Sequence, residues 1–195
     1  DFTTWVETTK GVKLKTNFVG SGNSFGDMYN SVKTGQEGVI GLGNITIREG
    51  RKKEVSFSPA FMNSFAILAS HKSVTELSAL SAISTEFNGM KAWAAAGTTN
   101  EQRVLNLKKE HYPSLTVESV SSSPEAMQKI LSNSRSFSYL DITFYLDAVK
   151  NGKSLRRHAV GDNGSEEFGL IMPLGSDWAP IMAEFFQAKN YRSSN

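Results

Sequence analysis

Residues Gly43–Phe61 read GNITIREGRKKEVSFSPAF and are the most informative part of this chain. They follow the apolar run Gly38–Gly43, which is typical of a short buried strand in a parallel sheet. Thr46 and Arg51 therefore come just past a predicted strand, where open α/β sheets bind their ligands. The guanidinium of Arg51 offers two parallel hydrogen bonds to a carboxylate. The same arginine, followed by two lysines, fits a solvated basic turn equally well.

Helical and strand periodicities alternate along the rest of the chain. Apolar residues recur every three or four positions in the helical stretches and every second position in the strands. The predicted helices cover 2–9, 25–32, 77–87, 98–107, 123–131, 145–149 and 178–185, and the predicted strands cover 12–18, 38–43, 90–95, 115–120, 137–140 and 168–172. Such alternation predicts an α/β protein with mainly parallel sheets.

The composition excludes several classes of function. The 195 residues include 21 Lys and Arg against 19 Asp and Glu, and the formal charge of +2 is too small to indicate binding to nucleic acid. The absence of cysteine excludes disulfides, a cysteine nucleophile and thiolate metal sites. The three histidines lack metal-ligand spacing, so we expect neither a metal nor a cofactor. No run of about eighteen apolar residues is present, and we expect no direct membrane insertion.

The Gly43–Phe61 stretch resembles the signature of the polar-amino-acid family of bacterial extracellular solute-binding proteins, family 3. Thr46 and Arg51 fall at the family's spacing without a gap. The family's usual Gly, second Thr and Asp are replaced here by Asn44, Arg48 and Ser56. Further motifs follow in the family's order: a Gly-Thr-Thr turn at 97–99, a Ser-x-x-Glu-Ala helix at 122–131, a strand at 137–141 that ends in Asp, and the segments 167–170 and 173–176.

The resemblance implies a type II periplasmic-binding fold, in which two α/β lobes hold a ligand cleft between them. We expect lobe 1 to comprise residues 1–68 and 165–195, and lobe 2 to comprise residues 69–164. The two crossings near 66–70 and 162–167 would act as the hinge. The resemblance also implies that this chain begins after the family's first strand and that its end, at 192–195, lacks the last helix.

A free amino acid presents one carboxylate and one ammonium group, and both lobes carry groups that suit it. The expected ligand-binding residues are Asn44, Thr46, Arg51, Thr98, Thr99, Asn100 and Asp141. Arg51 and Thr46 would hold the carboxylate, together with the predicted helix N-terminus at Thr98. Asp141 would accept from the ammonium, as would the backbone carbonyl of Asn44. Thr98 fits a plain capping box equally well, and Asp141 fits a cap on the following helix.

We therefore expect a non-enzymatic protein that binds an amino acid by lobe closure and serves an ABC permease or a signalling module. Its expected location is periplasmic or extracellular, with a possible membrane tether through a removed N-terminus. Two other classes stay open. One is a solute-binding module of an enzyme, either associated with a lytic transglycosylase or similar to cyclohexadienyl dehydratase. The other is a scaffold that binds a partner and has a non-functional cleft.

Overall fold

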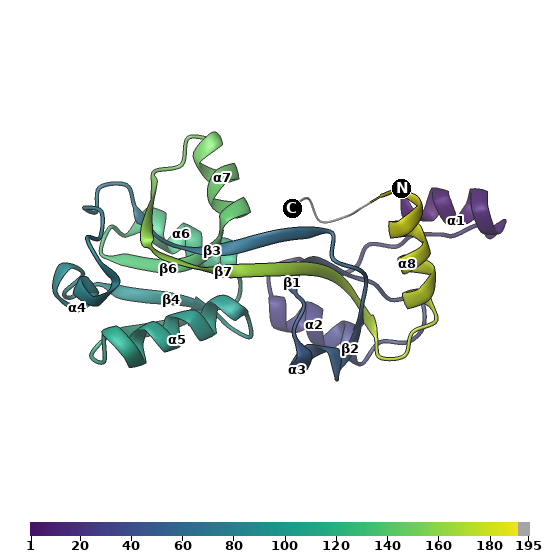
Figure 1. Cartoon of the computed structure of the whole chain (residues 1–195), viewed down its shortest axis with the longest axis horizontal. Helices are drawn as coiled ribbons and strands as arrows, with labels where there is room; N and C mark the ends of the chain where they lie inside the picture. Colours follow the sequence, from purple (N-terminus) through teal and green to yellow (C-terminus); the bar gives the residue numbers. More distant parts are fainter. Residues whose placement is uncertain (191–195) are drawn as a thin grey trace. The chain divides into compact units, whose positions relative to one another are not determined.

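Helices and strands alternate along residues 1–190, which the computed structural model describes (Figure 1). The helices are α1 (Phe2–Lys10), α2 (Phe25–Lys33), α3 (Glu49–Lys52), α4 (Ile83–Glu86), α5 (Thr99–His111), α6 (Ser123–Ser132), α7 (Ile142–Lys150) and α8 (Trp178–Ala188), with a short 3₁₀ helix η1 (Leu80–Ala82). The strands are β1 (Gly41–Thr46), β2 (Val55–Phe57), β3 (Met62–His71), β4 (Lys91–Ala95), β5 (Thr116–Val120), β6 (Ser136–Asp141) and β7 (Leu155–Pro173).

The chain forms two units, and each is assembled from separate segments. Unit 1 comprises Asp1–Gly22, Asp27–Asn63 and the residues from Glu166 onward, and unit 2 comprises Asn23–Gly26 and Ser64–Ser165. Strands β3 and β7 therefore contribute residues to both units. The sequence places the lobe boundaries at 68/69 and 164/165, whereas the units divide at 63/64 and 165/166. The expected chain end without a last helix, at 192–195, lies outside the described residues.

Unit 2 is built on the strand order β3-β6-β4-β5. Strand β4 pairs in parallel with β5 and with β6, and helices α5 and α6 supply the crossovers that parallel pairs require. Strand β3 runs antiparallel to β6, as β1 and β2 do to β7. The α/β class is confirmed, and the parallel pairs join β6, β4 and β5, with β5 at the edge of the sheet.

The two faces of the unit 2 sheet carry separate apolar cores, because successive side chains on a strand point to opposite faces. The residues that pack with α5, η1 and α4 include Ala66, Leu68, Ala92, Ala94, Phe137 and Tyr139. The residues that pack with α6 and α7 include Ile67, Ala69, Trp93, Ala95 and Leu140. Figure 1 shows α5 on one side of these strands and α6 with α7 on the other. A sheet covered by helices on both faces is the usual setting of parallel strands.

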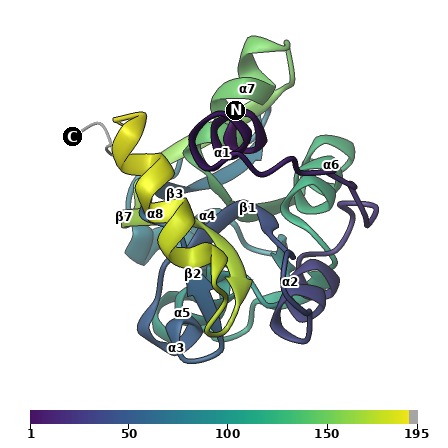
Figure 2. The same cartoon turned by 90° about the vertical axis from the view of Figure 1, so that its right-hand side faces the viewer.

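Unit 1 contains an aromatic cluster between its first and last described helices. Phe2 and Trp5 of α1 contact Phe185 of α8, with ring centroids 5.3 and 5.6 Å apart. Phe2 also meets the edge of Trp178 at 5.7 Å. Figure 2 shows α1 beside α8. These contacts agree with the helical spacing of the same residues in the sequence.

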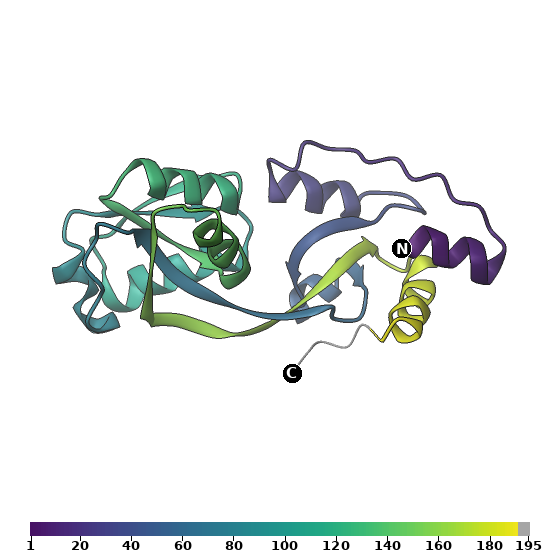
Figure 3. The same cartoon turned by 90° about the horizontal axis from the view of Figure 1, so that it is seen from above.

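The predicted strand at 12–18 is wrong. The segment between α1 and α2 has no strand pairing and runs as an irregular trace (Figure 3). Phe18 and Val19 are 84% and 90% exposed. Residues 14–18, together with Gly38, Ile40 and Leu42, line one pocket of about 590 Å³. Alternation in the sequence reports a side chain's preference for a pleated surface, but it does not reveal whether a neighbouring strand is present.

Other predictions differ in extent or in pairing. The strand predicted at 168–172 is only the last part of β7. The apolar run 38–43 predicts a parallel strand, whereas β1 starts at Gly41 and pairs antiparallel with β7. Leu42 is 56% exposed, whereas a buried strand would cover its side chain. The predicted helix at 77–87 forms only as η1 and α4. Within residues 1–190 no helix is long and apolar enough to cross a membrane.

His158 is a fully buried polar group in unit 2. Its Nδ1 accepts a hydrogen bond from the backbone N–H of Leu77 at 3.0 Å, so Nε2 carries the proton and donates to Ser70 Oγ at 2.7 Å. The imidazole is therefore neutral and cannot act as a base toward Ser70. Burial, with a smaller contribution from the charge of Arg156 and a partial opposition from Glu86, lowers the pKa of His158 to about 4.

We expect this histidine to make the protein acid-sensitive. The pKa is lower in the folded state than in the unfolded chain, so the stability contribution is complete above about pH 6.5 and is lost as the pH falls toward about 4. The loss is roughly 3 kcal/mol of unfolding free energy. Urea unfolding between pH 7 and pH 4 measures it. His158→Gln should flatten this part of the profile. An unchanged profile in His158→Gln contradicts the assignment.

Candidate functional site

Arg51 lies in the last turn of the short helix α3 in unit 1 and is half-buried, whereas the following two lysines are exposed. Its Nη1 donates to the backbone carbonyl of Thr46 at 3.1 Å. Its guanidinium lies 5.7 Å from the centre of the Tyr29 ring. Burial lowers the pKa of Arg51, with a smaller contribution from Arg48. The guanidinium is therefore anchored and partly desolvated, unlike the side chains of a solvated basic turn.

Thr46 and Glu166 form a buried pair beside this arginine. The Thr46 hydroxyl donates to Glu166 Oε1 at 3.4 Å, and both side chains are less than 9% exposed. Glu166 lies on β7, near the residues that pair with the end of β1. Its carboxylate attracts the guanidinium of Arg51 and so opposes the lowering of that pKa. Glu166 falls in the expected crossing between the lobes near 162–167, and no sequence motif identifies it as a site residue.

Tyr29 and Glu54 complete the surroundings of Arg51 in unit 1. The Tyr29 hydroxyl donates to Glu54 Oε2 at 3.0 Å, and Lys33 donates to Oε1 of the same carboxylate at 2.9 Å. Burial, followed by the interaction with Glu54, raises the pKa of Tyr29 to about 12. Tyr29 therefore keeps its proton, and its ring presents a neutral aromatic face to Arg51. Asn44 lies in the irregular part of β1, where the register against β7 shifts.

In unit 2, Thr98 is the N-cap of α5. Its Oγ1 accepts from the backbone N–H of Glu101 at 3.2 Å and donates to the carbonyl of Ala95 at 2.7 Å. The Glu101 carboxylate accepts from the backbone N–H of Gly97 at 2.9 Å. The half of the predicted capping box that runs from Glu101 N–H to Thr98 is therefore formed, whereas the Glu101 carboxylate reaches the residue before the N-cap, because the Thr98 N–H donates to the Ala95 carbonyl. Thr99 is the first residue of α5.

Asp141 is the last residue of β6 and precedes α7, but its side chain makes no capping hydrogen bond to that helix. It is 7% exposed, and its Oδ1 accepts from Asn100 Nδ2 at 3.1 Å. Asn100 Oδ1 in turn accepts from Arg103 Nη1 at 3.0 Å. The carboxylate thus contacts the first turn of α5 through Asn100. Arg103 is a further residue near the site that no sequence motif identifies.

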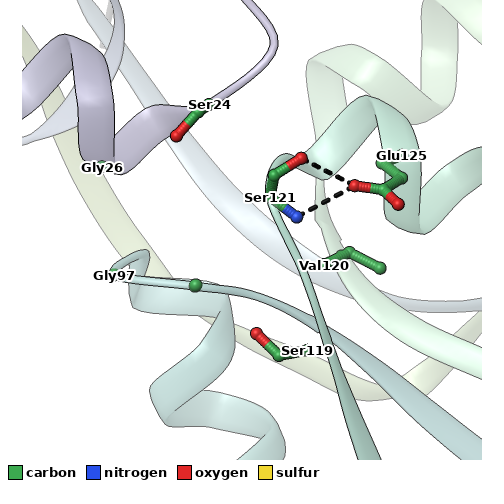
Figure 4. A pocket seen from close by; sticks show the side chains of 8 residues that line it. Ser24, Gly26, Gly97, Ser119, Val120, Ser121 and Glu125 are labelled. Atoms are coloured by element: carbon green, nitrogen blue, oxygen red, sulfur yellow. Dashed lines mark hydrogen bonds between the residues drawn. The ribbon is translucent and has the colours of Figure 1, made fainter.

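A pocket of about 620 Å³ opens at the carboxyl ends of β4 and β5 in unit 2. It is lined by Ser24, Gly26, Ala96, Gly97, Ser119, Val120, Ser121 and Glu125 (Figure 4). The Glu125 carboxylate accepts from the backbone N–H and the hydroxyl of Ser121 at 2.9 and 2.7 Å, which lowers the pKa of Glu125. The backbone N–H of Phe25 donates to the Ser121 carbonyl at 3.2 Å. Most of the lining residues are small, and the pocket lies at the edge where open α/β sheets bind ligands.

The sequence-predicted residues fall into two groups. The structure brings Arg51 together with Thr46 in unit 1 and Asn100 together with Asp141 in unit 2. Asn44 belongs to unit 1, and Thr98 and Thr99 belong to unit 2. Among residues 1–190, no cluster of His, Asp and Glu is arranged to hold a metal ion.

Comparison with known proteins identifies the fold. No protein-family model matches the chain, and no curated protein sequence matches it. Solved structures do match. The arginine-, lysine-, histidine-binding protein ArtJ from Geobacillus stearothermophilus is 17% identical with a TM-score of 0.73, over 97% of this chain and 80% of that one. The chain has the type II periplasmic-binding fold.

Two further structures extend this similarity. An ancestral arginine-binding protein bound to arginine is 21% identical, with a TM-score of 0.71 over 95% of this chain and 80% of that one. The ancestral amino acid-binding protein AncCDT-1, a precursor of cyclohexadienyl dehydratase, is 20% identical, with a TM-score of 0.70 over 95% of this chain and 78% of that one. The fold predicted from the sequence motifs is confirmed.

Proposed function

We propose that this protein binds a free amino acid outside the cytoplasm and releases it chemically unchanged. The observation that carries the proposal is Asp141. A nearly buried carboxylate at the carboxyl end of a strand, which begins a helix without capping it, is placed to receive a cation. The ammonium group of an amino acid is such a cation.

The second anchor in the proposal is Arg51, which would bind the ligand carboxylate. Its guanidinium carries five N–H donors, and its bond to the Thr46 carbonyl fixes it in place. Thr46 would support the carboxylate from the same side, and the Asn44 carbonyl would accept a further hydrogen bond from the ammonium. The first turn of α5, at Thr98, Thr99 and Asn100, would add backbone N–H donors.

The two groups of residues would act together through lobe closure. A ligand that touches both groups gains its full binding energy only when both are engaged, so it shifts the open and closed populations by that difference. Strands β3 and β7, which contribute residues to both units, would act as the hinge. The closed form would then be read by an ABC permease or by a signalling module.

The similar structures suggest the ligands to test first. Their names describe proteins that bind arginine, lysine and histidine, and one ancestral arginine-binding protein is bound to glutamine. L-Arginine and L-glutamine are therefore the first probes. The dehydratase precursor AncCDT-1 is itself an amino acid-binding protein, so its similarity favours binding over catalysis.

Thermal unfolding in the presence of single amino acids tests the proposal. A ligand that binds only the folded protein stabilises it by about 2.7 kcal/mol at a concentration one hundred times its Kd. We expect at least one amino acid to raise Tm, and the des-amino analogue of that amino acid to raise it much less. If none of the twenty amino acids raises Tm, the proposed function is wrong.

A further inference from the structure

Three polar side chains in unit 2 form a continuous row that ends at the proposed ammonium site. Arg103 Nη1 donates to Asn100 Oδ1 at 3.0 Å, and Asn100 Nδ2 donates to Asp141 Oδ1 at 3.1 Å. Arg103 and Asn100 are three positions apart on α5 and therefore share one face of that helix. Asn100 is 3% exposed, and Arg103 is half-buried.

The last residue of this row, Asp141, belongs to β6. Tyr139 and Asp141 are two positions apart on that strand, so their side chains lie on the same face. Arg103 interacts electrostatically with Tyr139, which belongs to the core between α5 and the sheet. Arg103 therefore lies near the face of β6 that carries Tyr139 and Asp141.

The chemistry of Arg103 decides which way the Asn100 amide points. A guanidinium only donates hydrogen bonds, so the group that faces Arg103 must be the Asn100 oxygen. The Asn100 nitrogen then faces the Asp141 carboxylate, which only accepts when ionised. A reversed amide would place its oxygen against the carboxylate and its nitrogen against the guanidinium, and both contacts would be repulsive.

We propose that Arg103 is a positioning residue for the ammonium site, because it orients Asn100 and through it the carboxylate of Asp141. The inference rests on the proposed function, in which Asp141 receives the ligand's ammonium group. Arg103 does not touch the ligand. It selects amino acids over analogues without an amine by holding the acceptor in one orientation.

Calorimetric titration of Arg103→Ala with L-arginine and with its des-amino analogue, δ-guanidinovaleric acid, tests the proposal. We expect the affinity for L-arginine to fall about tenfold, as one buried polar contact commonly supplies, and the affinity for the analogue to change less than twofold. The same pair of titrations with L-glutamine and glutaramic acid applies if the wild type prefers glutamine. Arg103→Lys keeps one donor toward Asn100 and should recover part of the discrimination.

The matched control is Arg135→Ala, which removes an arginine from an exposed site of the same unit, where it donates to the Asn88 carbonyl. It should leave both affinities unchanged. If Arg103→Ala weakens both ligands equally, or weakens neither, the positioning role is wrong.

A second readout does not depend on any ligand. In the wild type the buried Asn100 side-chain amide should exchange its protons slowly in an NMR experiment, and in Arg103→Ala the exchange should become at least tenfold faster. Unchanged exchange overturns the positioning role. If the wild type binds no amino acid, the proposed function fails by itself, and this exchange measurement still decides the role of Arg103.

Discussion

Arg51→Ala is expected to weaken amino-acid binding by about 2–5 kcal/mol, which is roughly 30-fold to several thousand-fold in Kd. The reason is the half-buried position of the guanidinium beside Thr46. Without Arg51, the carboxylate of the bound amino acid loses a charge-assisted, bidentate partner. Because the site is partly desolvated, the charge of that carboxylate is then left unsatisfied. Calorimetric titration with the preferred amino acid measures the loss.

Two further variants show whether the loss is specific. Arg51→Lys keeps the charge but not the planar fork, so it should recover only part of the affinity. Lys53→Ala removes an exposed basic side chain two positions away and should bind like the wild type. Full affinity in Arg51→Ala would exclude Arg51 as the carboxylate anchor.

Asp141→Asn is expected to weaken amino acids by about 2–5 kcal/mol while it changes the affinity for des-amino analogues little. The substitution keeps the shape of the side chain, and the new amide oxygen still accepts from Asn100. Only the charge is lost. An ammonium group needs that charge, and an analogue without the amine does not. Parallel titrations with L-glutamine and glutaramic acid separate the two effects.

Asp147→Asn is the matched control for this experiment. Asp147 is exposed on α7, where its carboxylate accepts from the side chain of Asn151 at 3.2 Å. The same chemical change at this position should leave both affinities unaltered. If Asp141→Asn weakens the amino acid and its analogue by the same factor, Asp141 has a structural role and the ammonium site lies elsewhere.

Local patterns in the sequence predict β4, α5, β5, α6 and β6 of unit 2 well, but they miss β3 and the part of β7 that belongs to this unit. The N-cap bond from Glu101 N–H to Thr98 forms as expected, because both partners lie within one turn, although the Glu101 carboxylate accepts from Gly97 and not from Thr98. Helix α6 starts at Ser123, as predicted, with Ser122 as the N-cap and Pro124 inside the first turn. The strand at 12–18 fails, because strand formation depends on a partner that is not encoded in the segment itself.

The same distinction separates the site residues that sequence reasoning finds from those that it misses. Thr46 and Arg51 are five positions apart and carry a recognisable spacing. Glu166 is 120 positions from Thr46, from whose hydroxyl it accepts a hydrogen bond, and only the pairing of β1 with β7 brings the two residues together. Arg103 leaves a weaker local signal, because it is one turn from Asn100, but its importance depends on the contact with β6 through Asp141.

The central claim is that the protein binds a free amino acid and does not alter it. Mass spectrometry of the small molecules that the purified wild-type protein releases on denaturation, after incubation with an equimolar mixture of the twenty amino acids and removal of unbound material, tests it most directly. We predict one intact amino acid, at up to one molecule per chain, and none from the Arg51→Ala variant treated in the same way. A chemically altered product, or no released amino acid from the wild type, would contradict the account.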